Sequence, residues 1–279
     1  MQKWTVKTNS DDAVVKRAIE FVSNEVFSSC GYVPQDSDGE RVMEFIMDGS
    51  VAKQGYDLTI TNDRVTIKGG DGNGVLYGAV DFIGEYINGV LTASEDIFLE
   101  NAFESVFDKP FPSFSKKSVP SIKERGIWSW GHCVYDYKKF FENMAKLKLN
   151  MAVIWNDEVP TNALEVINYA HSFGIKVYFG YAWGWDNKQN QSDYLTKEAI
   201  AKLKESCVKK YEETHLPLGL DGIYFQSFTE TTNEYMGDKT IAEVVTGLVN
   251  EISGELLRLY PDLKIQFGLH ALSTKNHLD

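Results

Sequence analysis

The hydrophobic and polar positions divide the chain into two patterns that meet near residue 121. In residues 11–27 the apolar side chains recur three and four positions apart, which predicts an amphipathic helix. A second helical run ends near residue 86. Short runs rich in β-branched and aromatic residues predict strands at 4–6, 41–47, 56–60 and 65–67, the last two joined as a hairpin. The candidate N-caps of the first helix are Ser10, Asp11 and Asp12. This pattern is typical of a small α+β domain.

Beyond residue 121 short apolar runs alternate with amphipathic helices. The predicted strands are residues 122–130, 151–155, 176–181, 222–225 and 264–269. The predicted helices are residues 136–149, 162–173, 197–214 and 241–260. Strands that are apolar on both faces and separated by helices indicate parallel pairing, and therefore an α/β fold. A doubly wound Rossmann sheet and a (β/α) barrel both satisfy this alternation.

A proline-rich stretch separates the two patterns. Pro110, Pro112 and Pro120 interrupt any regular element between about residues 101 and 121. We therefore predict an N-terminal domain over residues 1–105, a linker over 106–121, and the first part of a barrel over 122–279.

The glycine-rich turn Gly69 to Gly74 precedes the second helix of the first domain, a position where backbone N–H groups can bind phosphate. No Lys-Ser or Lys-Thr pair follows these glycines, and the strands before them form a hairpin rather than a βαβ unit. We expect the glycines to serve a structural purpose instead, through positive φ angles and close helix packing.

Charge and composition narrow the classes of partner. The 279 residues carry a formal net charge of -12, which repels nucleic acid and anionic lipid surfaces. No stretch is apolar enough to span a bilayer, and the first residues lack the pattern of a signal peptide. Three widely spaced cysteines suit reduced thiols better than a disulfide framework. The sequence therefore predicts a cytoplasmic protein with no nucleic-acid or membrane partner.

Polar and aromatic residues follow all five predicted strands, which favours the barrel, because each βα loop of a barrel contributes to an active site at the carboxyl ends of the strands. A doubly wound sheet concentrates its chemistry at one switch point instead. The candidate substrate-binding residues are Trp130, His132, Asn156, Asp157, Trp183, Trp185, Asp186, Gln226 and His270. Together they predict a site for an oligosaccharide, since tryptophan rings stack on the apolar faces of sugars. Trp128 and Trp155 fit either this platform or the core.

Glu230 is the candidate catalytic residue. Glycosidases work with two carboxyl groups, one of which stays protonated as the acid. Tyr224, Phe225 and Phe228 near Glu230 favour the raised pKa that this requires, although an exposed loop carboxylate is the simpler alternative. No His, Cys and Asp spacing matches a metal site, so we expect neither a metal nor another cofactor.

Residues 55–60 and 69–78 resemble the small N-terminal domain that precedes the catalytic barrel in family 20 hexosaminidases and family 67 α-glucuronidases. Arg125-Gly126 and Asp136-Tyr137 look like the start of that barrel. Family 20 enzymes place an Asp-Glu pair after the fourth strand, where this chain has Thr229-Glu230. Family 67 enzymes have a lone Glu there. The resemblance implies that Glu230 is the general acid.

We therefore expect a glycoside hydrolase that cleaves O-glycosidic bonds in oligosaccharides. The alternatives are a non-catalytic carbohydrate-binding remnant of such an enzyme and a different barrel enzyme acting on a small metabolite. A closed barrel has eight strands, and only about five are predicted here. The chain is then either a fragment or a half-barrel, and an exposed half-barrel predicts a homo-oligomer.

Overall fold

The computed structural model describes residues 4–30, 33–35, 39–87, 113–156, 158–183, 196–226 and 234–268. The chain forms two compact units. The first comprises residues 1–125, 139–150 and 170–175, and the second comprises residues 126–138, 151–169 and 176–279.

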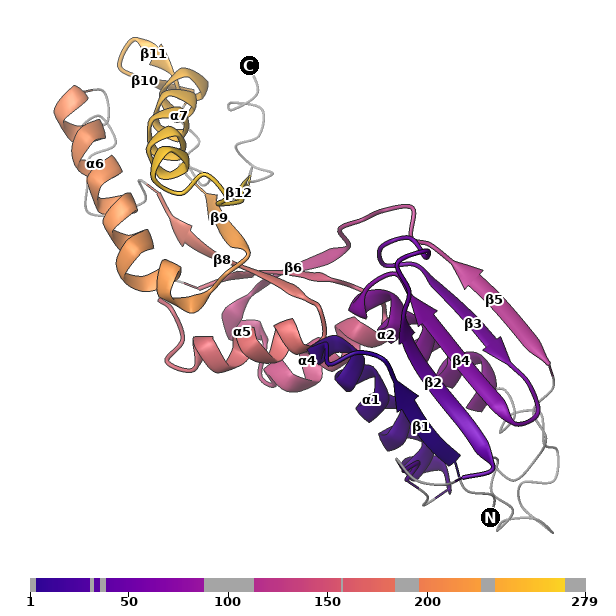
Figure 1. The fold of residues 1–279 in the computed structure, drawn as a ribbon. Helices are drawn as coiled ribbons and strands as arrows, with labels where there is room; N and C mark the ends of the chain where they lie inside the picture. Colours follow the sequence, from indigo (N-terminus) through magenta and orange to yellow (C-terminus); the bar gives the residue numbers. More distant parts are fainter. Residues whose placement is uncertain are drawn as a thin grey trace. The chain divides into compact units, whose positions relative to one another are not determined.

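The first unit is built on a five-stranded mixed sheet with the order β1-β2-β4-β3-β5 (Figure 1). Its strands are β1 (Trp4–Thr8), β2 (Arg41–Met47), β3 (Tyr56–Ile60), β4 (Arg64–Gly69) and β5 (Phe114–Ser118). Strands β1, β2 and β4 are parallel, whereas β3 is antiparallel to both β4 and β5. The four predicted strands and the predicted hairpin are confirmed.

Strand β5 corrects the prediction that no regular element lies between residues 101 and 121. Phe114–Ser118 pairs with the whole of β3, from Ile60 opposite Phe114 to Tyr56 opposite Ser118. The prolines at 110, 112 and 120 lie outside these five residues, so none of them removes a donor from the ladder. Because β5 is an edge strand beyond the hairpin, its short, polar sequence does not display the apolar alternation of a central strand.

Helices α1 (Ala13–Cys30) and α2 (Gly72–Phe82) lie against one face of this sheet (Figure 1). Asp12 caps α1, since its Oδ1 accepts hydrogen bonds from the backbone N of Val14 at 2.8 Å and of Val15 at 3.2 Å. Asp71 caps α2 in the same way, accepting from Gly74 N at 2.9 Å. A π-helical turn, Ile83–Ile87, follows α2. Both predicted helices are confirmed.

The glycine-rich turn is confirmed as a site of close packing, but the expected positive φ angles are wrong. A Cβ atom on Gly70 would collide with the carbonyl oxygen of Ala52, and one on Gly74 with that of Gly55. Among the described residues the glycines with positive φ are Gly174, Gly219 and Gly237. The turn therefore needs glycine for the close approach of neighbouring backbone rather than for a left-handed conformation.

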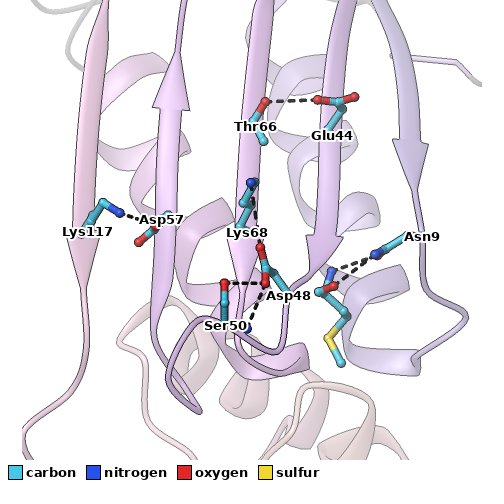
Figure 2. Close-up of polar contacts among 9 residues, drawn as sticks. Asn9, Glu44, Asp48, Ser50, Asp57, Thr66, Lys68 and Lys117 are labelled. Carbon is cyan, nitrogen blue, oxygen red and sulfur yellow. Dashed lines mark hydrogen bonds and ion pairs between the residues drawn. The ribbon is translucent and has the colours of Figure 1, made fainter.

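The face of the first sheet that is turned away from the helices is polar, and its side chains bond to one another (Figure 2). Lys117 Nζ lies 2.7 Å from Asp57 Oδ2, and Thr66 donates to Glu44 Oε2 at 3.2 Å. Asp48 accepts from the Ser50 hydroxyl at 2.7 Å. This mutual pairing is typical of a solvated surface.

A polar cluster inside the first unit is centred on Arg125. Its guanidinium donates to the carbonyl oxygen of Lys148 at 2.9 and 3.0 Å, to the Tyr77 hydroxyl at 3.0 Å and to Gln54 Oε1 at 3.0 Å. These bonds join three separate segments of the chain, so Arg125 serves as a fixed cross-link in this unit.

The second unit contains a five-stranded parallel sheet, which confirms the α/β prediction (Figure 1). Its strands in spatial order are β6 (Gly126–Trp130), β7 (Met151–Trp155), β8 (Lys176–Ala182), β9 (Gly222–Gln226) and β12 (Ile265–Phe267). Spatial order therefore follows chain order throughout. A doubly wound sheet would reverse its order at a switch point.

The four predicted helices of this region are confirmed to within a few residues. They are α4 (Tyr137–Lys146), α5 (Ala163–Ser172), α6 (Lys197–Lys210) and α7 (Ile241–Leu259). A π-helical turn, Tyr211–His215, extends α6. A small hairpin of β10 (Tyr235–Met236) and β11 (Lys239–Thr240) precedes α7 and was not predicted, because two-residue strands leave no periodic signal.

Helices α6 and α7 cover one face of the parallel sheet and form its core. The buried residues of this core are Tyr181, Trp183, Cys207, Tyr211, Ile223, Phe225, Ile252 and Leu256. Among the helices that the structure describes, none combines the length and apolar character needed to cross a membrane.

Candidate functional site

The second sheet brings one residue from each strand into a single row near the carboxyl ends. In the strand register, Trp130 pairs with Trp155, Trp155 with Gly180, Gly180 with Tyr224, and Tyr224 with Gln266. Registered partners in a sheet point to the same face, so these five residues share the face opposite to the α6 and α7 core.

Four aromatic rings form a connected group on this face. Trp155 meets Trp130 and Tyr224 edge to face, with centroid distances of 6.1 Å in both cases. Trp128 lies two residues before Trp130 and therefore on the same face of β6. Its ring centroid is 5.1 Å from that of Trp130 and 6.1 Å from that of Tyr224. Edge-to-face contacts of this length stabilise aromatic groups beyond the area they bury. The rings therefore support each other as one unit, here called the aromatic platform.

Glycines make room for the platform. A Cβ atom on Gly180 would lie 2.5 Å from Trp155 Cε3 and 3.0 Å from Tyr224 Cδ1. A Cβ atom on Gly268 would collide with the Tyr224 hydroxyl. The Trp155 and Tyr224 rings thus lie directly over backbone that carries no side chain.

The platform combines exposed rings with a buried support. Trp128 and Trp130 are 39% and 40% exposed, whereas Trp155 is 7% exposed. Large apolar rings that remain open to solvent at the carboxyl ends of parallel strands can stack on the C–H face of a sugar. The buried Trp155 ring packs edge to face against Trp130 and so supports the exposed part of the platform.

His132 and Asn156 lie beside the platform. The His132 ring is exposed, and its centroid is 5.9 Å from that of Trp130 at an interplanar angle of 35°. The Asn156 amide fills the space that a side chain on Gly131 would occupy. Tyr137 shares a hydrogen bond with Asn156; burial raises the pKa of the Tyr137 hydroxyl, and this bond opposes the rise. The structure thus brings three predicted residues together: Trp130, His132 and Asn156.

Trp183 is the exception among the predicted residues that the structure describes. It is 1% exposed, and its ring stacks on Phe225 with a centroid distance of 3.7 Å and an interplanar angle of 6°. Its position along the strand explains this. Counting from Gly180, odd-numbered residues of this segment face α6 and α7, and Trp183 continues that series. The ring belongs to the core and offers no open face for stacking.

The remaining predicted residues are not placed. Asp157, Trp185, Asp186, Glu230 and His270 lie outside the described residues. Gln226 ends β9, and its side chain also lies outside them. Within the described ranges, no group of three or more His, Cys, Asp or Glu side chains could hold a metal ion.

The sequence reasoning missed Gly180 and Tyr137. Gly180 had a signal, because a lone glycine between aromatic residues in the middle of an apolar strand indicates a close approach by a neighbouring group. Tyr137 had none, since its bond to Asn156 depends on the tertiary fold.

Comparisons with known proteins bear on the fold of the chain. No protein-family model and no curated protein match the sequence. A solved structure described as a GH138 enzyme targeting pectin rhamnogalacturonan II matches with a TM-score of 0.54 and 14% sequence identity. The match covers 95% of this chain and 38% of that chain, so the protein spans about two fifths of the length of that enzyme. At this identity the likeness shows the fold alone. The chain shares the fold of part of a glycoside hydrolase.

Proposed function

We propose that the protein is a glycoside hydrolase that cleaves O-glycosidic bonds in oligosaccharides, with Glu230 as the general acid. The observation that carries this proposal is the pair of exposed rings, Trp128 and Trp130, at the carboxyl ends of a parallel sheet. The shared fold with part of a glycoside hydrolase supports it.

The finer fold that we propose is a (β/α) barrel whose first strands are β6 to β9 and β12. The unbroken agreement of spatial order with chain order supports it, since a barrel adds each new strand beside the previous one. The aromatic platform would then line the barrel interior at the face where barrel enzymes bind substrate. The resemblance of residues 55–78 to the N-terminal domains of family 20 and family 67 enzymes agrees with this arrangement.

The general acid of a glycosidase protonates the leaving oxygen, and it needs a raised pKa to keep its proton near neutral pH. Glu230 follows β9, the strand that supplies Tyr224 to the platform and Phe225 to the core. Tyr224 of β9 contacts Trp128 of β6, so the strand that precedes Glu230 in the sequence contributes to the platform. A second carboxyl group, acting as a base or nucleophile, completes the mechanism.

The solved structure offers a first choice of substrate. That enzyme is described as targeting pectin rhamnogalacturonan II. We propose side-chain fragments of this polysaccharide as the first compounds to assay, together with general neutral oligosaccharides.

Glu230→Gln tests the assignment, with Glu234→Gln as a matched control in the same segment. We expect the release of reducing sugar to fall about 10²- to 10⁴-fold in Glu230→Gln, the usual contribution of a general acid, while Glu234→Gln keeps the wild-type rate. Full activity in both variants would exclude Glu230 as the acid. Sugar binding without turnover in the wild type would instead support the non-catalytic carbohydrate-binding alternative.

Two further predictions accompany the proposed function. Cell fractionation would test the cytoplasmic location, and light scattering of the purified protein would test the homo-oligomer. A monomeric peak would contradict the latter.

A further inference from the structure

The second unit contains a cavity whose lining shares no residue with the aromatic platform. It has a volume of about 320 Å³ and is formed by the segment before α4 and by the first turns of α4 and α5. Its lining includes Tyr135, Asp136, Tyr137, Lys138, Asn162 and Glu165. We propose that this cavity is a separate binding site for a neutral saccharide. The proposal does not depend on hydrolysis at the platform.

The size of the cavity fits a small ligand. Ligand pockets in proteins usually measure about 300–1,000 Å³, and a volume of about 320 Å³ lies at the lower end of this range. A compact molecule of one or two sugar rings suits this space better than a nucleotide or a folded peptide segment.

Tyr135 provides the stacking surface. Its side chain is 98% exposed, so the ring buries almost none of its area in the folded protein. A ring in this state contributes little to the stability of the fold, whereas it can cover the apolar face of a ligand at the mouth of the cavity. Tyr137 adds a second ring to the wall.

The charges around the cavity favour a neutral ligand. Asp136 and Glu165 contribute two carboxylates, against the single ammonium of Lys138. Lys138 Nζ lies 3.8 Å from Glu165 Oε1, and the charged side chains of the lining carry one more formal negative charge than positive charge. A uronate or a phosphate would be repelled. The carboxylate oxygens can instead accept hydrogen bonds from sugar hydroxyl groups, and the Asn162 amide can both donate and accept them.

The cavity also has a structural connection to the platform. Tyr137 shares a hydrogen bond with Asn156, and the Asn156 amide packs on Gly131, between Trp130 and His132 in the sequence. A saccharide in the cavity would therefore contact Tyr137, which is hydrogen-bonded to Asn156 beside the platform. A chain of sugars held at the cavity would be kept close to the proposed site.

The test uses the full chain in a Trp130→Ala background, which removes one of the two exposed platform rings. Lactose, maltose and xylobiose are the neutral probes, and digalacturonate is the anionic probe. Binding is measured by isothermal titration calorimetry and by saturation-transfer NMR. Tyr135→Ala is the test variant, and Tyr235→Ala is the matched control, because Tyr235 is an exposed tyrosine on β10, which contributes no residue to the cavity lining.

We expect at least one neutral probe to bind, and Tyr135→Ala to weaken that binding about tenfold or more, as for an aromatic contact worth over 1 kcal/mol. Tyr235→Ala should keep the affinity, and digalacturonate should bind more weakly. Equal affinity in Tyr135→Ala, an equal loss in Tyr235→Ala, tighter binding of digalacturonate, or no binding of any neutral probe would overturn the inference. Because no turnover is measured, these outcomes are distinct from a failure of Glu230→Gln to affect hydrolysis.

Discussion

Gly180→Ala is the sharpest test of the aromatic platform, because it adds one methyl group beneath two of its rings. The new carbon would lie 2.5 Å from Trp155 Cε3 and 3.0 Å from Tyr224 Cδ1. Carbon atoms pack at about 3.5–4.0 Å, so the Trp155 ring must retreat by roughly 1 Å. Both rings would move toward the neighbours that they contact, Trp130 and Trp128.

Two opposing effects set the size of the change in the free energy of unfolding of Gly180→Ala. Overpacking a close-packed site costs about 1–3 kcal/mol, and the overlap with Trp155 places this site in the upper part of that range. Replacing glycine by alanine also reduces the entropy of the unfolded chain, which stabilises the protein by about 0.4–1 kcal/mol. The difference is a net loss of about 1–2 kcal/mol in the free energy of unfolding.

Urea denaturation, followed by far-UV circular dichroism and by tryptophan fluorescence, measures this loss. Gly247→Ala is the matched control, since Gly247 lies in α7 and a Cβ there meets nothing within 4 Å. That variant should gain about 0.5–1 kcal/mol from the higher helix propensity of alanine. The two substitutions are chemically identical, and the structure predicts opposite signs for them.

Near-UV circular dichroism reports on the rings themselves. We expect Gly180→Ala to change the tryptophan signal and to weaken saccharide binding, and Gly247→Ala to leave both unchanged. A Gly180→Ala protein with wild-type stability and a wild-type near-UV spectrum would refute the close approach of Trp155 and Tyr224 to this backbone.

Two further predictions concern stability. Burial lowers the pKa of His215 from 6.5 to about 4. As the pH falls, the unfolded state therefore binds a proton at His215 before the folded state does. The free energy of unfolding should consequently fall by about 3 kcal/mol between pH 6.5 and pH 4. His215→Gln should lose this part of the slope in urea titrations at a series of pH values, and an unchanged slope would contradict the assignment. Arg125→Met should cost about 1.5–3 kcal/mol, because it leaves the buried acceptors of the cross-link unpaired. Arg64→Met, which breaks an exposed pair with Glu44, should cost under about 1 kcal/mol, and equal losses in the two variants would contradict the role of Arg125.

The elements with strong periodicity could be predicted from the sequence alone. Residues 151–155 are continuously apolar and are bounded by Asn150 and Asn156, and the structure gives β7 these bounds. The helix over residues 241–260 was predicted from its amphipathic pattern, and the structure shows that Thr240 and Glu243 form a capping box at its start. In both cases the local signal and the tertiary role agree, so no long-range information was needed.

Strand β5 could not be predicted for the opposite reason. The sequence Phe114–Ser118 is mostly polar, and it becomes a strand only because β3 presents an open edge to it. That edge belongs to β3, whose other side pairs with β4 and which lies more than fifty residues earlier in the chain, so no window of local sequence around residues 114–118 reports it. A context-dependent strand of this kind is the usual limit of pattern reasoning.

The aromatic platform shows which site residues can be predicted from the alternation of side chains between the two faces of a strand. The sequence analysis placed Trp130 and Trp183 together as substrate-binding residues, yet a strand turns successive residues to opposite faces. Trp130 and Trp155 are registered partners on the open face, whereas Trp183 lies three positions beyond Gly180 and therefore on the helix face. Counting residues from Gly180, which lies under the rings, would have assigned Trp183 to the opposite face. The same count, applied to β9, places Tyr224 with the platform and Phe225 in the core, so the exposed face of this sheet can be derived from register once a single inward position is known.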